Sequence, residues 1–378
     1  MIVHAGRQEL YSIAIQAAKA VAKTSTIEEL KGIHFEADAE RNMVTLTATD
    51  NEVVVRASLP ATVQESGTAV VPAQLFTGIL QKLPETEVNI ASSVGNQMDF
   101  SAGTAFFRIS VLPTNKYPMP ELPFPEDSVA VQGINSLYRR TAFAAATGNE
   151  KPVFTCIKLT LTSDGLRACA CNGLCMAEAR GDESCKGKVE LLIPAASLGL
   201  LASMSQDSDI YQMGITGKSV VFWDGTLLFS ARLLEGDFLD ANTMFSSLSL
   251  CYTVQAKAEE LAHGIASATS VAGHGEKLKV EFRDHELYFS IESQYGAGAA
   301  PVPAIVANAP PTPIYYNPRV LQNCLRTMKG DVTLSFSREG HMVITSGGVR
   351  CLQMAMRPPQ PEKKGKAPKK AAAAREAA

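Results

Sequence analysis

The stretch Ile193-Pro194-Ala195-Ala196-Ser197-Leu198 decides the fold, because two other parts of the chain resemble it at one fixed distance. Val71-Pro72-Ala73-Gln74-Leu75 precedes it by 122 residues (194 − 72). A second step of the same length reaches Tyr316, inside Ile314-Tyr-Tyr-Asn-Pro-Arg-Val-Leu321. Self-similarity at a fixed period is the signature of a repeated structural unit. The sequence therefore predicts three copies of one unit.

The same spacing relates positions outside this stretch. Asp50 corresponds to Asn172, and Phe107 corresponds to Phe229 and then to Cys351. A chain of 378 residues has the length of two or three ordinary domains. We expect three similar domains at 1–124, 125–246 and 247–357, followed by a tail at 358–378.

Each unit begins with an amphipathic helix, in which apolar residues recur at helical spacing. The expected apolar faces are Leu10, Ile13, Ala14, Ala17 and Val21; then Ile134, Leu137, Tyr138 and Ala145; then Val254, Ala258, Leu261, Ala262 and Ile265. The opposite faces carry Ser12, Gln16, Lys19 and Lys23 in the first unit and Asn135, Arg139 and Arg140 in the second. In the third unit this face is mixed, with Lys257, Glu259 and Glu260.

A second helix follows Pro72, Pro194 and Pro318. Asn317-Pro318 is a strong start signal, since Asn caps a helix and Pro suits its first position. Behind it Arg319, Gln322, Arg326 and Lys329 form a basic stripe. Strands with period-two alternation fill the rest: Val44–Ala48, Lys158–Thr162, Lys279–Phe282 and Val332–Phe336. Short turns between them favour antiparallel pairing, so we expect an α+β class with two helices packed on antiparallel sheets in each domain.

Charge is unevenly distributed along the chain. The tail 358–378 holds six basic and two acidic residues and so has a charge of +4, which leaves −7 on residues 1–357 when the whole chain is −3. The tail has no large apolar residue and is expected to be disordered; it either touches nucleic acid or only aids solubility. A signal peptide and a long apolar run are not evident, so we expect a soluble intracellular protein without a membrane partner.

The sequence shows no convincing catalytic or metal site. It lacks the phosphate-loop, zinc-protease and nucleophile-elbow motifs, and Gly296-Ala-Gly298-Ala-Ala-Pro301 is interpreted as a loop. Cys169, Cys171, Cys175 and Cys185 do not have the spacing of paired zinc knuckles, so reduced buried thiols are favoured over a metal-dependent hydrolase. Asp50 and Asn172 suit turn capping. We expect a protein that is not an enzyme and needs no cofactor.

Several segments resemble the bacterial DNA polymerase III beta subunit family, the sliding clamps. Leu46-Thr-Ala-Thr-Asp50 is similar to the family's first-domain LTATD, and Phe143-Ala with Asn149-Glu-Lys-Pro152 is similar to the start of its second domain. Arg232-Leu-Leu-Glu-Gly236-Asp-Phe238-Leu-Asp240 resembles its R-L-I-x-G-x-F-P-D-Y, and Met354-Ala-Met356-Arg357 its terminal M-P-M-R. The resemblance covers about residues 5–357.

The resemblance implies a head-to-tail homodimer, a ring whose helices surround duplex DNA and hold it by sequence-independent contacts. Such a ring is a processivity factor for DNA replication in the bacterial cytoplasm, associated with the nucleoid. Each basic residue could instead be part of a solvated helix face. The expected DNA-lining residues are Lys19, Lys23, Arg139, Arg140, Arg319, Arg326 and Lys329.

The family also binds polymerase and clamp-loader peptides in a groove between its second and third domains. The positions that match this groove are Cys171, Gly173, Leu174, Met176, Leu239, Leu352, Met354 and Met356; they could alternatively be domain-interface core. The family's D-G-H-R-L is here Asn172-Gly-Leu-Cys-Met176, and small residues at Ala268–Ser270 replace large apolar dimer contacts. These departures keep open a second hypothesis, a clamp-fold scaffold that binds proteins but does not close on DNA.

Overall fold

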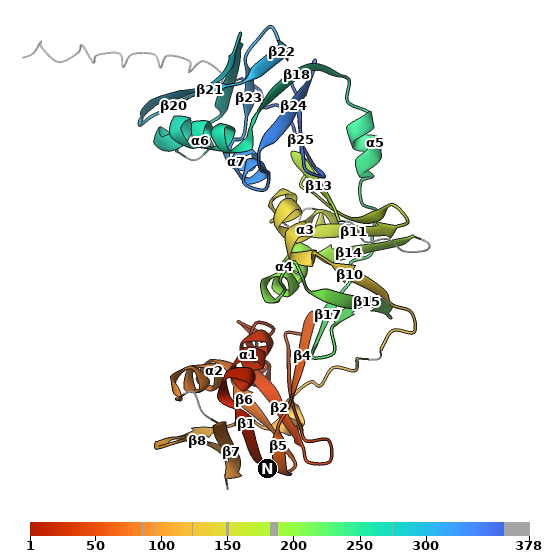
Figure 1. Cartoon of the computed structure of the whole chain (residues 1–378), viewed down its shortest axis with the longest axis vertical. Helices are drawn as coiled ribbons and strands as arrows, with labels where there is room; N and C mark the ends of the chain where they lie inside the picture. Colours follow the sequence, from red (N-terminus) through yellow and green to blue (C-terminus); the bar gives the residue numbers. More distant parts are fainter. Residues whose placement is uncertain are drawn as a thin grey trace, which may run out of the picture. The chain divides into compact units, whose positions relative to one another are not determined.

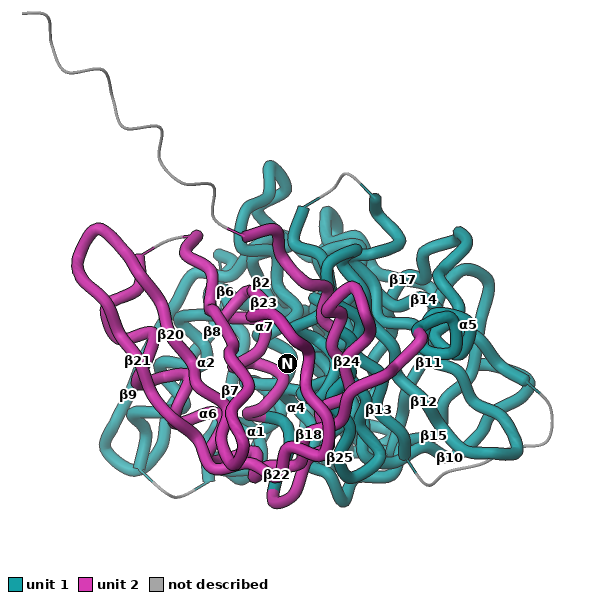
Figure 2. The backbone as a smooth tube through the Cα atoms, turned by 90° about the horizontal axis from the view of Figure 1, so that it is seen from above, with its two compact units in different colours: residues 1–248, 327–329, 343–352 teal, residues 249–326, 330–342, 353–378 magenta. Residues whose placement is uncertain are grey.

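The computed structural model of the chain describes residues 1–84, 87–93, 95–122, 124–148, 151–181, 188–273 and 275–358 (Figure 1). Cys185, Asn149 and all but the first residue of the tail 358–378 lie outside these ranges. The chain forms two compact units, coloured separately in Figure 2. Unit 1 comprises 1–248, 327–329 and 343–352, and unit 2 comprises 249–326, 330–342 and the remaining residues from 353.

One order of elements occurs three times: a strand, a helix, three strands, a further strand, a second helix and three strands. The first copy is β1 (Ile2–Gly6), α1 (Arg7–Ala18), β2 (Gly32–Asp38), β3 (Met43–Thr49), β4 (Val53–Pro60), β6 (Gly67–Pro72), α2 (Ala73–Lys82), β7 (Glu87–Ser93), β8 (Gln97–Ala102) and β9 (Ala105–Ser110). The second copy is β10 (Val129–Gln132), α3 (Ile134–Thr141), β11 (Cys156–Thr162), β12 (Gly165–Cys171), β13 (Cys175–Arg180), β14 (Val189–Pro194), α4 (Ala195–Met204), β15 (Ile210–Thr216), β16 (Ser219–Trp223) and β17 (Leu227–Arg232).

The third copy follows the short helix α5 (Ala241–Ser246). It consists of β18 (Leu250–Lys257), α6 (Ala258–Ala268), β19 (Leu278–Arg283), β20 (Glu286–Ser293), β21 (Gly296–Pro303), β23 (Ile314–Tyr316), α7 (Pro318–Leu325), β24 (Asp331–Ser337), β25 (Met342–Ser346) and β26 (Val349–Gln353). The first and third copies each add one strand, β5 (Thr62–Glu65) and β22 (Ile305–Asn308). This recurrence agrees with the period read from the sequence.

The sheets are antiparallel, as predicted from the short turns. In unit 1 one sheet has the strand order β5-β1-β7-β8-β9, and an eight-stranded sheet has the order β10-β15-β16-β17-β4-β3-β2-β6. The first two copies share this second sheet through the pairing of β17 with β4, from Leu227 opposite Ala57 to Ala231 opposite Val53. Unit 1 also contains the neighbours β14-β11-β12-β13-β26-β25, and unit 2 contains β24-β18-β22 and β21-β20-β19-β23.

The two helices of each copy pack against one another: α1 on α2, α3 on α4 and α6 on α7. Leu10, Ile13, Ala14 and Ala17 are buried on α1, as the helical spacing predicted. Some predicted positions are wrong because the helices are shorter than their apolar patterns. Val21 and Ala145 lie beyond the helix ends, and Val254 lies in strand β18.

Gly296–Pro301 is a strand, which corrects its interpretation as a loop. The segment forms most of β21 and pairs with β20 from Ser293 opposite Gly296 to Glu286 opposite Pro303. Its small residues let a helix approach closely, since a Cβ on Gly298 would lie 2.1 Å from the Ala268 carbonyl oxygen. Gly298 is therefore present for close packing and not for loop flexibility.

The turn between the second and third of the three consecutive strands is stabilised in the same way in every copy, by a side-chain oxygen that accepts backbone N–H groups of the turn. Asp50 Oδ1 accepts the backbone N–H groups of Glu52 and Val53, at 3.0 and 2.8 Å. Asn172 does the same for Leu174 and Cys175, both at 2.9 Å. The third copy uses Ser293, whose Oγ accepts the Tyr295 N–H at 3.1 Å. The predicted capping role of Asp50 and Asn172 is confirmed.

Candidate nucleic-acid and peptide interfaces

The basic residues predicted to contact DNA lie at or near helix ends, and several already have protein partners. Lys19 is the C-terminal cap of α1, and its Nζ donates to the Ser203 carbonyl oxygen at 2.8 Å and to Ser203 Oγ at 3.1 Å. Burial lowers the pKa of Lys19. Lys23 is exposed but lies in the loop after α1 rather than on the helix. Lys19 therefore joins α1 to α4 instead of projecting freely.

The second and third copies supply the remaining basic candidates. Arg139 lies in the last turn of α3 and pairs with Asp207 at 2.8 Å, while Arg140 beside it is half-buried. Arg319 is exposed in the first turn of α7, and Arg326 is its exposed C-terminal cap. Lys329 is exposed and follows the helix. The Asp207 carboxylate already offsets the charge of Arg139, which makes Arg139 a weaker candidate for binding phosphate.

Asn317 gives α7 a firm start. Its Oδ1 accepts the backbone N–H of Arg319 at 3.0 Å, and Pro318 occupies the first helical position. Leu321, Cys324 and Leu325 are buried beneath the helix. The predicted cap is confirmed, and the exposed side of the helix carries Arg319.

The β12–β13 turn presents an apolar side chain to solvent. Gly173 has a φ of +85°, a conformation that favours glycine, and the next residue, Leu174, is 68 % exposed. Cys171 and Met176, which flank the turn, are buried. Of the predicted peptide-binding residues in the turn, Leu174 can meet a partner directly, whereas Cys171 and Met176 form the layer beneath it.

Two aromatic residues beside this turn were missed by the sequence reasoning. A Cβ on Gly173 would lie 4.0 Å from the Phe154 ring, and Phe154 meets Phe238 edge to face with centroids 6.2 Å apart. Leu239 follows Phe238 and is 38 % exposed. Phe238 belongs to the Arg232–Asp240 string that carries the family resemblance, and that string was the available signal. We call Phe154, Leu174, Phe238 and Leu239 the apolar surface of unit 1.

The other predicted peptide-binding residues have different settings. Leu352 is buried on β26 in unit 1. Met354 and Met356 belong to unit 2 and are half-buried. The Met356 N–H donates to the Tyr315 carbonyl oxygen at 2.7 Å, which fixes this stretch along β23. Only backbone atoms of Met356 are used in that bond, so its side chain remains a candidate for partner contact.

Cys169, Cys171 and Cys175, the described members of the predicted cysteine cluster, are buried thiols. Burial raises the pKa of Cys169 and Cys171, and it raises the pKa of Cys175 to about 12. A thiol with a raised pKa is a poor nucleophile and a poor metal ligand at neutral pH. In the part of the chain that the structure describes, no three His, Cys, Asp or Glu side chains are grouped so as to hold a metal ion.

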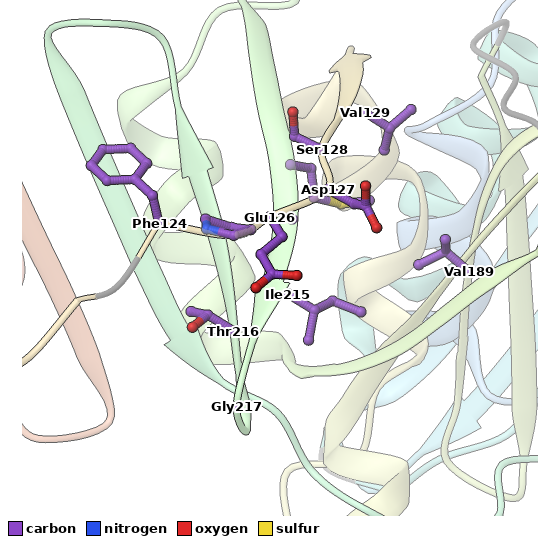
Figure 3. A pocket seen from close by; sticks show the side chains of 12 residues that line it. Phe124, Glu126, Asp127, Ser128, Val129, Val189, Ile215, Thr216 and Gly217 are labelled. Carbon is purple, nitrogen blue, oxygen red and sulfur yellow. The ribbon is translucent and has the colours of Figure 1, made fainter.

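A cavity of about 950 Å³ lies elsewhere in unit 1 and includes none of the predicted site residues. Figure 3 shows its walls, formed by the connector residues Phe124, Glu126, Asp127 and Ser128 and by Ile215 and Thr216 of β15. The Phe124 ring meets Trp223 edge to face at 5.5 Å. Gly214 is required beneath the connector, because a Cβ there would lie 2.5 Å from Pro125.

Family models match the first two copies. Residues 1–123 match the DNA polymerase III beta subunit N-terminal domain, and residues 128–240 match its central domain. Together the matched ranges cover more than half of the chain. The chain belongs to the DNA polymerase III beta subunit family.

Named relatives agree with the beta subunit assignment. A beta sliding clamp of Staphylococcus epidermidis is 27 % identical over 240 residues, and the match covers 60 % of this chain and 63 % of the relative. A beta sliding clamp of Staphylococcus aureus is 24 % identical over 334 residues, which is 83 % of this chain and 86 % of that one.

Solved beta subunit structures share the fold. The DNA polymerase sliding clamp of Bacillus subtilis superposes with a TM-score of 0.87 at 21 % identity, covering 95 % of this chain and all of that one. The DNA polymerase III beta subunit of Thermotoga maritima gives a TM-score of 0.86 at 20 % identity, over 95 % and 100 % of the two chains. Coverage of this extent includes most of the third copy as well.

No helix in the described ranges combines the length and apolarity that a membrane crossing demands.

Proposed function

We propose that this protein is a DNA sliding clamp, a non-catalytic processivity factor that encircles duplex DNA and tethers the replicative polymerase. The observation that carries the proposal is the match of its first two copies to the beta subunit family. The repeated domains 1–124, 125–246 and 247–357 supply the architecture. A cytoplasmic location at the nucleoid follows from this role.

The arrangement of sheet edges supports head-to-tail dimerisation. The last strand of the second copy, β17, pairs with β4, the third of the consecutive strands in the first copy. In the same way β26 lies beside β13 in unit 1. Among the described strands, β9 and β21 are the equivalent pair without a neighbour on their outer side. A second copy of the chain would satisfy both edges, and two such contacts close a ring.

Both edges have features that restrict what can pair with them. Phe106 on β9 is 59 % exposed, which leaves an apolar side chain for a partner to cover. Pro301 and Pro303 on β21 lack an N–H, so they limit pairing to a register that does not need those donors. These features favour a specific contact over indiscriminate edge-to-edge association.

The expected partners are duplex DNA, bound without regard to sequence, and peptides of the polymerase and the clamp loader. Arg319 and Arg326 are proposed to contact phosphates, since a ring holds DNA by topology and needs only weak contacts. The apolar surface of unit 1, with Cys171, Met176 and Leu352 beneath it, is proposed to receive the peptides.

The test measures mass, shape and retention on DNA. Small-angle scattering with mass determination should show a hollow dimer, and protein loaded on nicked circular DNA should remain bound until the DNA is linearised. Phe106→Glu should shift the mass towards the monomer and abolish retention, whereas Ile27→Glu, another exposed apolar position, should change neither. A monomer at every concentration, with no topological retention, would favour the scaffold that does not close on DNA.

A further inference from the structure

Arg350 on β26 contacts three side chains that come from two other elements of unit 1. Its Nε donates to Glu178 on β13, and its Nη2 donates to Asn242 Oδ1 on α5 at 2.6 Å. Its guanidinium carbon also lies 4.3 Å from the centre of the Phe245 ring on α5. One side chain therefore joins β26, β13 and α5.

The Glu178 carboxylate depends on this contact. Glu178 is 4 % exposed and stands opposite Cys169 in the sheet. A buried carboxylate needs a paired charge or hydrogen bonds, because transfer from water is otherwise costly. Arg350 supplies both, and the planar guanidinium has donors left for Asn242.

The helix α5 depends on Arg350 for a different reason. It has six residues, too few to be stable without tertiary contacts. Asp240 caps its start by accepting the Thr243 N–H at 2.8 Å, and Phe245 is buried. The cap satisfies a backbone N–H at the start of the helix. Arg350 makes a different contact, because it attaches the exposed residue Asn242 to the sheet.

The three elements that Arg350 joins also carry residues of the proposed peptide site. Met176 is two residues from Glu178, Leu352 is two residues from Arg350, and Leu239 is three residues before Asn242. Alternate strand residues share a face, so Met176 and Glu178 point to the same side of β13. The position of Leu239 and Phe238 relative to β13 is therefore linked to the Arg350 contacts.

We infer that Arg350 is a positioning residue for peptide binding: it holds the start of α5 on β13 and thereby fixes Phe238 and Leu239 beside the β12–β13 turn. This inference rests on the proposed function. Arg350 does not itself belong to the apolar surface, so it acts through the segment that it anchors.

Two readouts test the inference on the full-length protein. The first is hydrogen–deuterium exchange across residues 238–246. The second is the affinity for a fluorescein-labelled peptide from the clamp-binding segment of a bacterial replicative polymerase. Arg350→Met should accelerate exchange in this segment and weaken peptide binding by about tenfold, the ratio that follows from losing about 1.4 kcal/mol. Asn242→Ala keeps the Glu178 pair intact and should produce the same pattern more weakly, so a folding defect is not needed to see the effect.

Arg283→Met is the matched control. Arg283 also pairs with a glutamate, Glu286 at 2.8 Å, and also stacks on an aromatic ring, Tyr288 at 3.7 Å, but it lies in the β19–β20 hairpin of unit 2. It should change neither readout. Arg350→Lys retains a charge for Glu178 but lacks the forked guanidinium that reaches Asn242. Compared with Arg350→Met, it should recover the stability of the fold but not the slow hydrogen–deuterium exchange of α5.

The outcomes separate the inference from the proposed function. Unchanged exchange at 238–246 in Arg350→Met would overturn the inference, as would faster exchange with unaltered peptide affinity. If the wild-type protein fails to bind the peptide, the proposed peptide site is wrong, and the exchange pattern still decides whether Arg350 positions α5.

Discussion

Asn317 shows how a single side chain specifies an element boundary. Its Oδ1 accepts the Arg319 N–H and so satisfies one of the donors that every helix start leaves unpaired. The Asn-Pro pair could be predicted as a helix start from the sequence, because the capping interaction is local. The partner of Lys19 was not, because Ser203 comes from another copy 184 residues away.

Asn317→Ala should lower the free energy of unfolding by about 1 kcal/mol, the usual loss when a polar cap is removed. Asn323→Ala is the control, since Asn323 is exposed within the same helix and alanine is the better helix former. Urea unfolding of both variants measures the difference. Equal destabilisation by the two substitutions would contradict the capping role.

Asp99 provides a pH-dependent contribution to stability. The Arg108 guanidinium, at 2.6 Å and 2.8 Å from the two carboxylate oxygens, lowers the pKa of Asp99 from 3.8 to about 2. A depressed carboxyl pKa stabilises the folded state above the unfolded value, and this contribution is lost as the pH falls through the folded value.

The stability difference between the wild-type protein and Asp99→Asn should therefore be constant above the ordinary pKa and should shrink as the pH falls towards about 2. Urea midpoints measured across this range test the expectation. A difference that stays constant throughout would show that Arg108 does not discriminate between the two protonation states.

Among the elements, the three pairs of helices and most strands followed from periodicity, whereas helix ends and β21 did not. Helical spacing continues past the last helical residue of α1 and α3, since residues after a helix can also face the core. The strand β21 is rich in glycine, alanine and proline and has no side-chain pattern to read. Its place in the sheet is set by pairing with β20, and its small residues let α6 approach closely.

Gly264 is the residue on α6 that permits this approach. A Cβ at Gly264 would lie 2.1 Å from Val302 Cγ2 on β21. Gly264→Ala should therefore destabilise unit 2 by about 1–3 kcal/mol through overpacking, even though alanine favours helices. Gly78→Ala in α2 is the control, because no atom lies within 4 Å of its added Cβ, and it should stabilise by up to about 1 kcal/mol.

Thermal unfolding of the two glycine variants distinguishes packing from propensity. Gly264→Ala should lower the unfolding temperature, and Gly78→Ala should raise it. If both variants gain stability, α6 can move away from β21 at little cost, and the close approach is not needed for the fold.

Across the full chain, the repeat and the family resemblance predicted the architecture, because both depend on spacing over long distances. The candidate sites were harder to predict. Exposure separates the residues of the proposed peptide site, and the sequence did not distinguish the buried Met176 from the exposed Leu174. Phe154 was missed because its place beside Gly173 arises only on folding.

Charge reversal at Arg319 and Arg326 tests the proposed DNA contacts. Arg319→Glu with Arg326→Glu should reduce retention on circular DNA and lower the salt dependence of binding, since fewer phosphates are neutralised. Far-ultraviolet circular dichroism should be unchanged. Arg338→Glu, which reverses one exposed charge in the β24–β25 turn, is the control for each single reversal; a loss equal to that of Arg319→Glu or Arg326→Glu alone would indicate a general charge effect.

The pairing of β17 with β4 makes the first two copies a single cooperative unit of unfolding. The ladder from Leu227 to Ala231 satisfies backbone groups of both copies, and it includes buried residues such as Phe229 and its partner Val55. Neither copy can open without exposing the other's apolar strand edge to water. A fragment that ends after the first copy would retain that bare edge, and we expect it to aggregate where the two-copy fragment stays dispersed.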